Sequence, residues 1–246
     1  MALTEKKKSQ EVVKKNDFER VPTGIPGLDK LIEGGFIKGS TILITGGTGT
    51  GKTTFCAQYL LEGLKRGEPC IYITLEEEPD EIKNDVKRFG FELEKYEKQG
   101  LLKIIYQNPF EVSDIPATII SQINSINAKR VVIDPISLVG MYMKDSIKFR
   151  KNLYDLLQRI KKTGVTTLLT SEILDNEIGI GEKSGSLSRD GVSEFIADGV
   201  IVLNLFGIGQ GISRSIIIRK MRRTNHGTDV YPMVITNKGI AIKRES

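Results

Sequence analysis

Short apolar runs alternate with segments of helical periodicity between residues 41 and 170 of the chain. The apolar runs are rich in β-branched residues, which is typical of buried strands. They predict strands at Thr41 to Thr45, Cys70 to Leu75, Leu101 to Tyr106, Arg130 to Asp134 and Val165 to Thr170. The intervening segments predict helices at Thr54 to Arg66, Pro79 to Arg88, Ile115 to Ile126 and around Phe149 to Ile160.

A different pattern follows at the C-terminal end, where apolar runs succeed one another without intervening helices. These runs predict a strand meander at residues 199–205, 215–218, 230–235 and 240–242. Alternating strands and helices followed by clustered strands predict an α/β fold with a mostly parallel sheet, helices on both faces and a C-terminal antiparallel extension. No long linker interrupts the pattern, so we expect one domain over residues 17 to 246.

The N-terminal 16 residues differ in composition from this domain. They hold five lysines against two glutamates, so they account for +3 of the formal net charge of +5. Such a polar, lysine-rich terminus predicts a flexible basic tail. The chain shows neither a signal peptide nor a membrane-spanning run, and Cys56 and Cys70 are too few for a disulfide framework, so we expect a soluble cytoplasmic protein. His226 is the single histidine, which excludes a multi-histidine metal site.

The most informative motif lies between the first predicted strand and the first predicted helix. It fits the pattern G-x-x-x-x-G-K-[ST], in which backbone N–H groups surround phosphates, a lysine reaches the outer phosphates and a hydroxyl ligates Mg²⁺. The start of a helix adds unpaired N–H donors there. The sequence therefore predicts a site for ATP or ADP with Mg²⁺, with Thr53 as a metal ligand. The nucleotide-binding residues are Gly46, Gly47, Thr48, Gly49, Thr50, Gly51, Lys52, Thr53 and Thr54.

Acidic residues end two of the other predicted strands. Asp134 ends the fourth strand and suits a Mg²⁺ carboxylate that acts directly or through water, although it could instead cap the turn before Pro135. Glu76 and Glu77 follow the second strand, where a carboxylate could deprotonate an attacking water. Their alternative role is that of acids favoured at a helix N-terminus, which suits Glu78 best. Because strands of a parallel sheet present their carboxyl ends at one edge, we expect these groups beside the phosphate loop.

These motifs together resemble the RecA-type ATPases of the KaiC family. The resemblance covers about residues 20 to 243 and includes the phosphate loop, the double glutamate, the strand ending at Asp134 and the segment from Lys220 to His226. It implies a homohexameric ring with ATP between subunits and with Glu76 and Glu77 assisting hydrolysis. It also implies that three residues reach the neighbour's nucleotide, namely Lys220, Arg222 and His226. Arg223 stands where the family usually has glycine.

Three other functions stay open at this point. A RecA- or RadA-like recombination ATPase would need a basic DNA-binding loop, but the segment from Asp175 to Glu194 carries a net charge of −3, which disfavours nucleic acid. A module that binds ATP without hydrolysing it would leave the paired glutamates unexplained. Self-phosphorylation on Ser or Thr follows the family's precedent. The sequence predicts an ATPase that changes ring conformation for a protein partner, and it does not name that partner.

Overall fold

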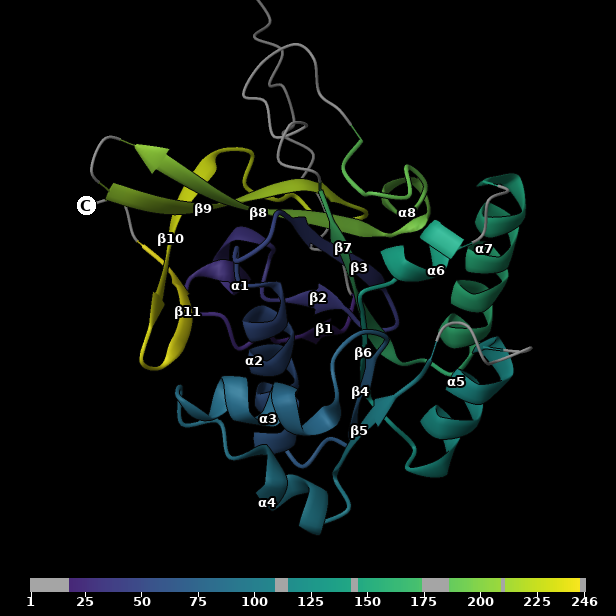
Figure 1. Cartoon of the computed structure of the whole chain (residues 1–246). Helices are drawn as coiled ribbons and strands as arrows, with labels where there is room; N and C mark the ends of the chain where they lie inside the picture. Colours follow the sequence, from purple (N-terminus) through teal and green to yellow (C-terminus); the bar gives the residue numbers. More distant parts are fainter. Residues whose placement is uncertain (1–17, 109–114, 143–145, 174–185, 209–210, 244–246) are drawn as a thin grey trace, which may run out of the picture.

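The computed structural model describes residues 18–108, 115–142, 146–173, 186–208 and 211–243, and the predicted basic tail lies outside them. Their main feature is a nine-stranded sheet of order β11-β10-β9-β8-β3-β7-β6-β4-β5 (Figure 1). Six strands are parallel: β3 (Thr41–Gly46), β4 (Cys70–Thr74), β5 (Leu102–Tyr106), β6 (Arg130–Asp134), β7 (Thr166–Glu172) and β8 (Gly199–Ile208). An antiparallel extension is added at one edge by β9 (Gly211–Met221), β10 (Val230–Thr236) and β11 (Gly239–Ile242). The predicted α/β class is confirmed.

Helices cover both faces of this sheet, so it buries two apolar clusters. On one face lie α2 (Lys52–Lys65), α3 (Pro79–Lys87) and α4 (Leu93–Lys98), and on the other lie α5 (Ile115–Ser125), α6 (Ser137–Tyr142) and α7 (Ser146–Lys162) (Figure 1). Alternate residues of one strand serve the two clusters, as Ile42 and Ile44 do for the first and Leu43 for the second. This explains why the parallel strands are continuous apolar runs in the sequence.

Several element boundaries differ from the sequence prediction. The first long helix begins at Lys52 rather than at Thr54, because the phosphate loop turns directly into it. The strand predicted to end at Thr170 continues to Glu172, since Ser171 and Glu172 still pair with β3. Sequence periodicity also missed the short elements β1 (Arg20–Val21), α1 (Leu28–Leu31), β2 (Phe36–Ile37), α4, α6 and α8 (Ser193–Ile196).

The segment from Asp175 to Glu194, which carries a net charge of −3, is described only in its C-terminal part. Residues 174–185 lie outside the described residues, whereas Glu194 lies in α8 and is buried. Its carboxylate accepts hydrogen bonds from Ser186 and Ser188, and Asp190 accepts from the backbone N–H groups of Val192 and Ser193. These two acids therefore hold a turn together, and they do not support the electrostatic argument against nucleic acid.

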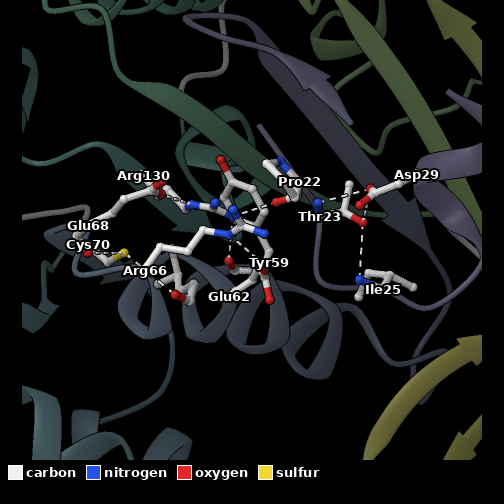
Figure 2. Close-up of polar contacts among 11 residues, drawn as sticks. Pro22, Thr23, Ile25, Asp29, Tyr59, Glu62, Arg66, Glu68, Cys70 and Arg130 are labelled. Carbon is white, nitrogen blue, oxygen red and sulfur yellow. Dashed lines mark hydrogen bonds and ion pairs between the residues drawn. The ribbon is translucent and has the colours of Figure 1, made fainter. Parts of the chain in front are cut away.

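A buried arginine joins the start of β6 to the chain that precedes the sheet (Figure 2). Arg130 is 0% exposed and its Nε forms an ion pair with Glu68 at 2.6 Å. Its Nη1 donates to the carbonyls of Pro22 at 2.7 Å and Tyr59 at 3.0 Å, and its guanidinium lies 4.7 Å from the centre of the Tyr59 ring. Arg130 thus fixes the lead-in segment, α2 and β6 relative to one another.

The described helices also bear on the question of membrane insertion. None of them is both long enough and apolar enough to span a bilayer.

Candidate functional site

Four parallel strands end at one edge of the sheet and bring the predicted site residues together. Gly46 pairs with Glu172 at the ends of β3 and β7, and Thr74 pairs with Asp134 at the ends of β4 and β6. The side chains beyond these ends enclose a cavity of about 220 Å³. Its lining includes Lys52, Thr53, Glu76, Glu77, Asp134 and Glu172. The arrangement places a cation, a hydroxyl and four carboxylates around one space.

The phosphate loop connects β3 to α2, and two of its glycines meet steric or backbone requirements that other residues do not. A Cβ on Gly46 would lie 2.3 Å from the carbonyl oxygen of Leu203. Gly51 has φ +107°, in the left-handed region, and it precedes the first residue of α2. Thr54 is buried inside α2 and does not line the cavity, so any contact it makes with a nucleotide would come through its backbone.

Lys52 stands at the first position of α2 with its ammonium over the loop. Its Nζ donates to the carbonyls of Gly46 and Gly47, at 3.0 Å each. Burial lowers the pKa of Lys52, and the nearby carboxylates of Glu172 and Asp134 act against that decrease. A phosphate at this place would give the ammonium a charged partner in exchange for two neutral carbonyls.

Asp134 is held by hydroxyl groups from three different elements. One carboxylate oxygen accepts hydrogen bonds from Tyr72 in β4 and from Thr53 in α2, the latter at 3.4 Å, and the other accepts from Thr170 in β7. Burial raises the pKa of Tyr72, and the Asp134 carboxylate adds to that effect. The Tyr72 hydroxyl therefore stays protonated and keeps donating to Asp134. Sequence reasoning missed Tyr72 and Thr170, because neither belongs to a linear motif.

The oxygen groups of Thr53 and Asp134 fit Mg²⁺, which binds oxygen ligands at short range. Among the described residues no group of three or more His, Cys, Asp or Glu side chains could hold a metal ion. Mg²⁺ typically takes only one or two protein carboxylates and completes its shell with waters and substrate phosphates. A hydroxyl and a carboxylate beside a phosphate loop match that requirement.

Glu76 and Glu77 lie in the turn between β4 and α3, and Thr74 shapes this turn. The Thr74 hydroxyl accepts from the N–H of Glu77 at 3.0 Å and donates to the Glu77 carbonyl at 2.7 Å. Burial raises the pKa of both glutamates; Glu172 and Asp134 add to the effect for Glu76, and Asp134 adds to it for Glu77. A carboxylate with a raised pKa is the better proton acceptor, so either residue suits a general base. Glu78 precedes α3, and its backbone N–H donates to Glu81.

One further pair of charged residues at the cavity was not among the predicted site residues. Glu172 lines the cavity, and its carboxylate forms an ion pair with Arg189 at 2.9 Å. The backbone N–H of Arg189 also donates to the Glu172 carbonyl at 2.9 Å and to the Ser171 hydroxyl at 3.2 Å. Arg189 lies in the segment that leads to α8, so this pair connects the cavity to that segment.

Arg222 lies at the opposite end of β3 from the phosphate loop of its own chain. Arg222 donates its N–H to the Asp198 carbonyl, and Asp198 in turn bonds to Thr41, the first residue of β3. The phosphate loop follows the other end of β3, five residues on, which is about 16 Å at a rise of about 3.3 Å per residue. None of the three side chains Lys220, Arg222 and His226 is among the described residues that line the cavity of their own protomer.

The same three side chains have partners within the protomer. Lys220 Nζ donates to the carbonyls of Glu194, Phe195 and Ala197, at 3.1, 3.3 and 2.6 Å, and burial lowers its pKa. Arg222 lies 3.4 Å from the Asp198 carboxylate, with half of its side chain exposed. His226 Nδ1 lies 2.9 Å from the Gly227 carbonyl. Arg223 has φ +56°, so the backbone keeps the left-handed conformation that favours the glycine usual at this place.

Comparison with known proteins identifies the family. The family model described as "ATPase: KaiC" matches residues 21–246. A UPF0273 protein of Methanopyrus kandleri is 34% identical over 244 residues, and the match covers 92% of this chain and 93% of the relative. Circadian clock protein KaiC3 of Synechocystis is 31% identical over 237 residues, which are 92% of this chain and 46% of that protein.

A solved structure supports the same assignment. The crystal structure of a KaiC-like protein from Pyrococcus horikoshii matches with a TM-score of 0.82 and 42% identity, over 92% of this chain and all of the other. The fold is therefore RecA-like, with the antiparallel strands as its C-terminal extension. The family match, the shared fold and the phosphate loop with its acids agree, and the chain belongs to the KaiC family of ATPases.

Proposed function

We propose that the chain is a Mg²⁺-dependent ATPase that assembles as a homohexameric ring, binds ATP between subunits and uses hydrolysis to change ring conformation for a protein partner. The observation that carries the proposal is the cavity at the ends of β3, β4, β6 and β7. Phosphoryl transfer needs charge neutralisation and a positioned water more than covalent chemistry. The cavity offers groups for both tasks.

Within one protomer the roles follow from position. The loop from Gly46 to Thr53 surrounds the phosphates with N–H groups, and Lys52 neutralises the outer phosphate charge. Thr53 and Asp134 would hold Mg²⁺, directly or through water, and the ion would supply Lewis-acid chemistry to the phosphates. Glu76 or Glu77 accepts the proton of the attacking water, because burial and neighbouring acids raise the pKa of each carboxyl.

The remaining groups come from the neighbouring protomer. Arg222 and Lys220 of that protomer approach the γ-phosphate, and His226 approaches the ribose or base. Support comes from the position of Arg222 at the opposite end of β3 from the phosphate loop, and from the absence of all three residues from the described lining of their own cavity. An arginine supplied in this way stabilises the charge of the transition state and contributes roughly 10³- to 10⁵-fold to the rate. Turnover would then require assembly.

Calorimetry of ATP and ADP binding, with and without Mg²⁺, combined with a phosphate-release assay, tests the proposal. We expect Lys52→Ala to abolish nucleotide binding, and Glu76→Gln and Glu77→Gln to identify the base by a rate loss of roughly 10²-fold or more in one of them. We expect Arg222→Ala to abolish turnover while leaving binding intact. Arg219→Ala removes another exposed cation, from β9, and should change neither. If the unaltered chain binds neither nucleotide with Mg²⁺, the proposal is wrong.

Three competing functions have separate readouts. Stimulation of phosphate release by single-stranded DNA would favour a recombination ATPase. A mass increase of one phosphate after incubation with ATP would show self-phosphorylation. Phosphate release at background level, unchanged in both glutamine variants, would instead favour a module that only binds ATP.

A further inference from the structure

A cationic groove with exposed aromatic residues lies between α7 and α8, on the side of the protomer that carries Arg222. It encloses about 550 Å³. Three apolar side chains on it are well exposed, namely Ile147 (81%), Phe195 (61%) and Tyr154 (51%). Large apolar residues gathered at a rim of charges are typical of a surface that binds another protein. This surface is called the α7–α8 groove below.

The charge of the α7–α8 groove is strongly positive. Arg150, Lys151, Lys161 and Arg222 line it, and no acidic residue is among the described residues of its lining. Asp198 lies beneath the groove and pairs with Lys161 at 2.7 Å and with Arg222 at 3.4 Å. Arg150 and Lys151 are exposed and form no ion pair within the described part of the chain. With four cations and one acid, the groove carries an excess of positive charge that an acidic partner would neutralise.

An acidic surface of matching kind lies on α3. Glu77, Glu81, Asn84 and Asp85 line a shallow concavity of about 450 Å³. Glu81, Asn84 and Asp85 share one stripe of α3, because Asn84 and Asp85 follow Glu81 by three and four residues, and Glu77, which lines the same concavity, lies in the turn just before the helix. Lys83 is a basic residue close to the stripe in the sequence, but it forms ion pairs with Asp80 at 2.8 Å and with Glu97 at 3.2 Å. The α3 stripe is therefore a patch of three carboxylates without a described cation.

The two surfaces cannot meet within one chain. The apolar side of α7 packs on one face of the sheet, through Leu153, Leu157 and Ile160, and the apolar side of α3 packs on the other, through Ile82 and Val86. In Figure 1 the two helices lie on opposite sides of the sheet. A contact between such surfaces of identical chains is head-to-tail, which produces rings when its rotation closes.

We propose that the α7–α8 groove receives the α3 stripe of a second copy of this chain. The inference rests on the proposed function, because Arg222 lines the groove and Glu77 belongs to both the stripe and the nucleotide cavity. Docking the stripe in the groove brings Arg222 of one copy towards the cavity of the next. The ion pairs would set the orientation of the copies, and the exposed apolar side chains of the groove would become buried.

Charge reversal on each surface, followed by mixing, tests the proposal. The groove variant is Arg150→Glu with Lys151→Glu, and the stripe variant is Asn84→Lys with Asp85→Lys. Both leave Arg222, Glu77 and Glu81 unchanged. Light scattering after size exclusion, with ATP and Mg²⁺ present, would measure assembly over a range of protein concentrations. We expect each variant alone to need about tenfold more protein, or more still, to half-assemble.

Mixing the two variants in equal amounts gives the sharper result. The reversed groove of one then faces the reversed stripe of the other, and the remaining contacts are those of the unaltered chain. We expect the mixture to recover assembly with alternating subunits. The control Arg159→Glu with Lys162→Glu reverses two exposed cations of α7 outside the groove and should assemble normally. Normal assembly of the groove variant alone, or no recovery on mixing, overturns the proposal.

Two further measurements distinguish docking of a second copy from a defect in nucleotide binding and from binding of nucleic acid. Binding of a fluorescent ATP analogue to each variant reports on the phosphate loop by itself. If no variant and no unaltered chain binds it while assembly still follows the charge pattern, the proposed function is wrong and the docking surface is right. Anisotropy of a labelled single-stranded oligonucleotide tests a nucleic-acid occupant. Oligonucleotide binding that the groove variant loses, with assembly unaffected, would overturn docking of a second copy.

Discussion

Replacing Arg130 should destabilise the domain more than most single changes, because one side chain joins three elements. Arg130→Ala removes the ion pair with Glu68 and the donors to Pro22 and Tyr59. It also leaves a cavity at a site that is 0% exposed. Arg130→Lys keeps a cation but cannot reproduce the planar fork of donors. We therefore expect Arg130→Lys to lower the free energy of unfolding less than Arg130→Ala does.

The magnitude follows from these contacts. Hydrogen bonds from a charged donor contribute about 1.5–3 kcal/mol each, and a cation over an aromatic ring in a dry site contributes about 2 kcal/mol. Desolvation of the guanidinium opposes these gains by several kcal/mol, and Nη2 has no hydrogen-bond partner among the described residues. We therefore expect the free energy of unfolding to fall by about 3–5 kcal/mol for Arg130→Ala and by about 1–2 kcal/mol for Arg130→Lys.

Urea unfolding at one protein concentration without nucleotide measures these changes. Circular dichroism and tyrosine fluorescence are suitable probes, because the chain has 7 Tyr and no Trp. The unfolding transitions reported by the two probes should coincide in each variant, so that one free energy of unfolding describes each transition. A loss below about 1 kcal/mol for Arg130→Ala, less than the lower bound for one of its hydrogen bonds, would refute the reasoning.

Gly63 provides an independent check on the same contact. A Cβ on Gly63 would lie 2.5 Å from Nε of Arg130. Gly→Ala inside a helix normally stabilises by about 0.5–1 kcal/mol, whereas overpacking costs about 1–3 kcal/mol. We expect Gly63→Ala to destabilise the unaltered chain and to do so less in the Arg130→Ala background. Equal losses of stability in both backgrounds would mean that contact with Arg130 is not the reason why alanine is unfavourable at position 63.

Three shorter predictions concern the site. Tyr72→Phe removes a hydroxyl that donates a hydrogen bond to Asp134, so we expect half-maximal turnover to need roughly tenfold more Mg²⁺. ATP binding without Mg²⁺ should be unchanged. A Mg²⁺ titration that superimposes on that of the unaltered chain would contradict this prediction. The pKa of Glu77 is raised in the folded state, so the folded protein binds this proton more tightly than the unfolded chain does. The contribution of Glu77 to the free energy of unfolding therefore falls as the pH rises from the ordinary glutamate pKa through the raised one. Glu77→Gln should raise the melting temperature at pH 7 but not at pH 4, and an equal shift at both pH values would oppose this prediction. Asp198→Asn weakens the ion pair with Arg222, so we expect phosphate release to fall by about tenfold or more, while the nucleotide affinity of the separate protomer stays the same. Unchanged turnover would show that Asp198 does not orient Arg222.

Local patterns predicted much of the site because local geometry produces it. The phosphate loop is one continuous turn, so its glycines and Lys52 are recognisable from spacing alone. The positions of Glu77 and Asp134 followed from a general property of parallel sheets, in which strand ends meet at one edge. Boundaries were less predictable: β7 continues to Glu172 because its partner β3 offers hydrogen bonds that far, and nothing in the sequence of β7 indicates this.

The sequence by itself determined the α/β class, the phosphate-loop motif and the family, because each depends on residues close together in the chain or on a recognisable order of motifs. Only the tertiary structure decided which hydroxyls hold Asp134, that Glu194 is buried, that Arg130 joins the lead-in to β6, and that Arg222 lies at the opposite end of β3 from the phosphate loop. These facts depend on contacts between elements that are distant in the chain. Strand order and side-chain packing create such contacts, and neither leaves a periodic signal in the sequence.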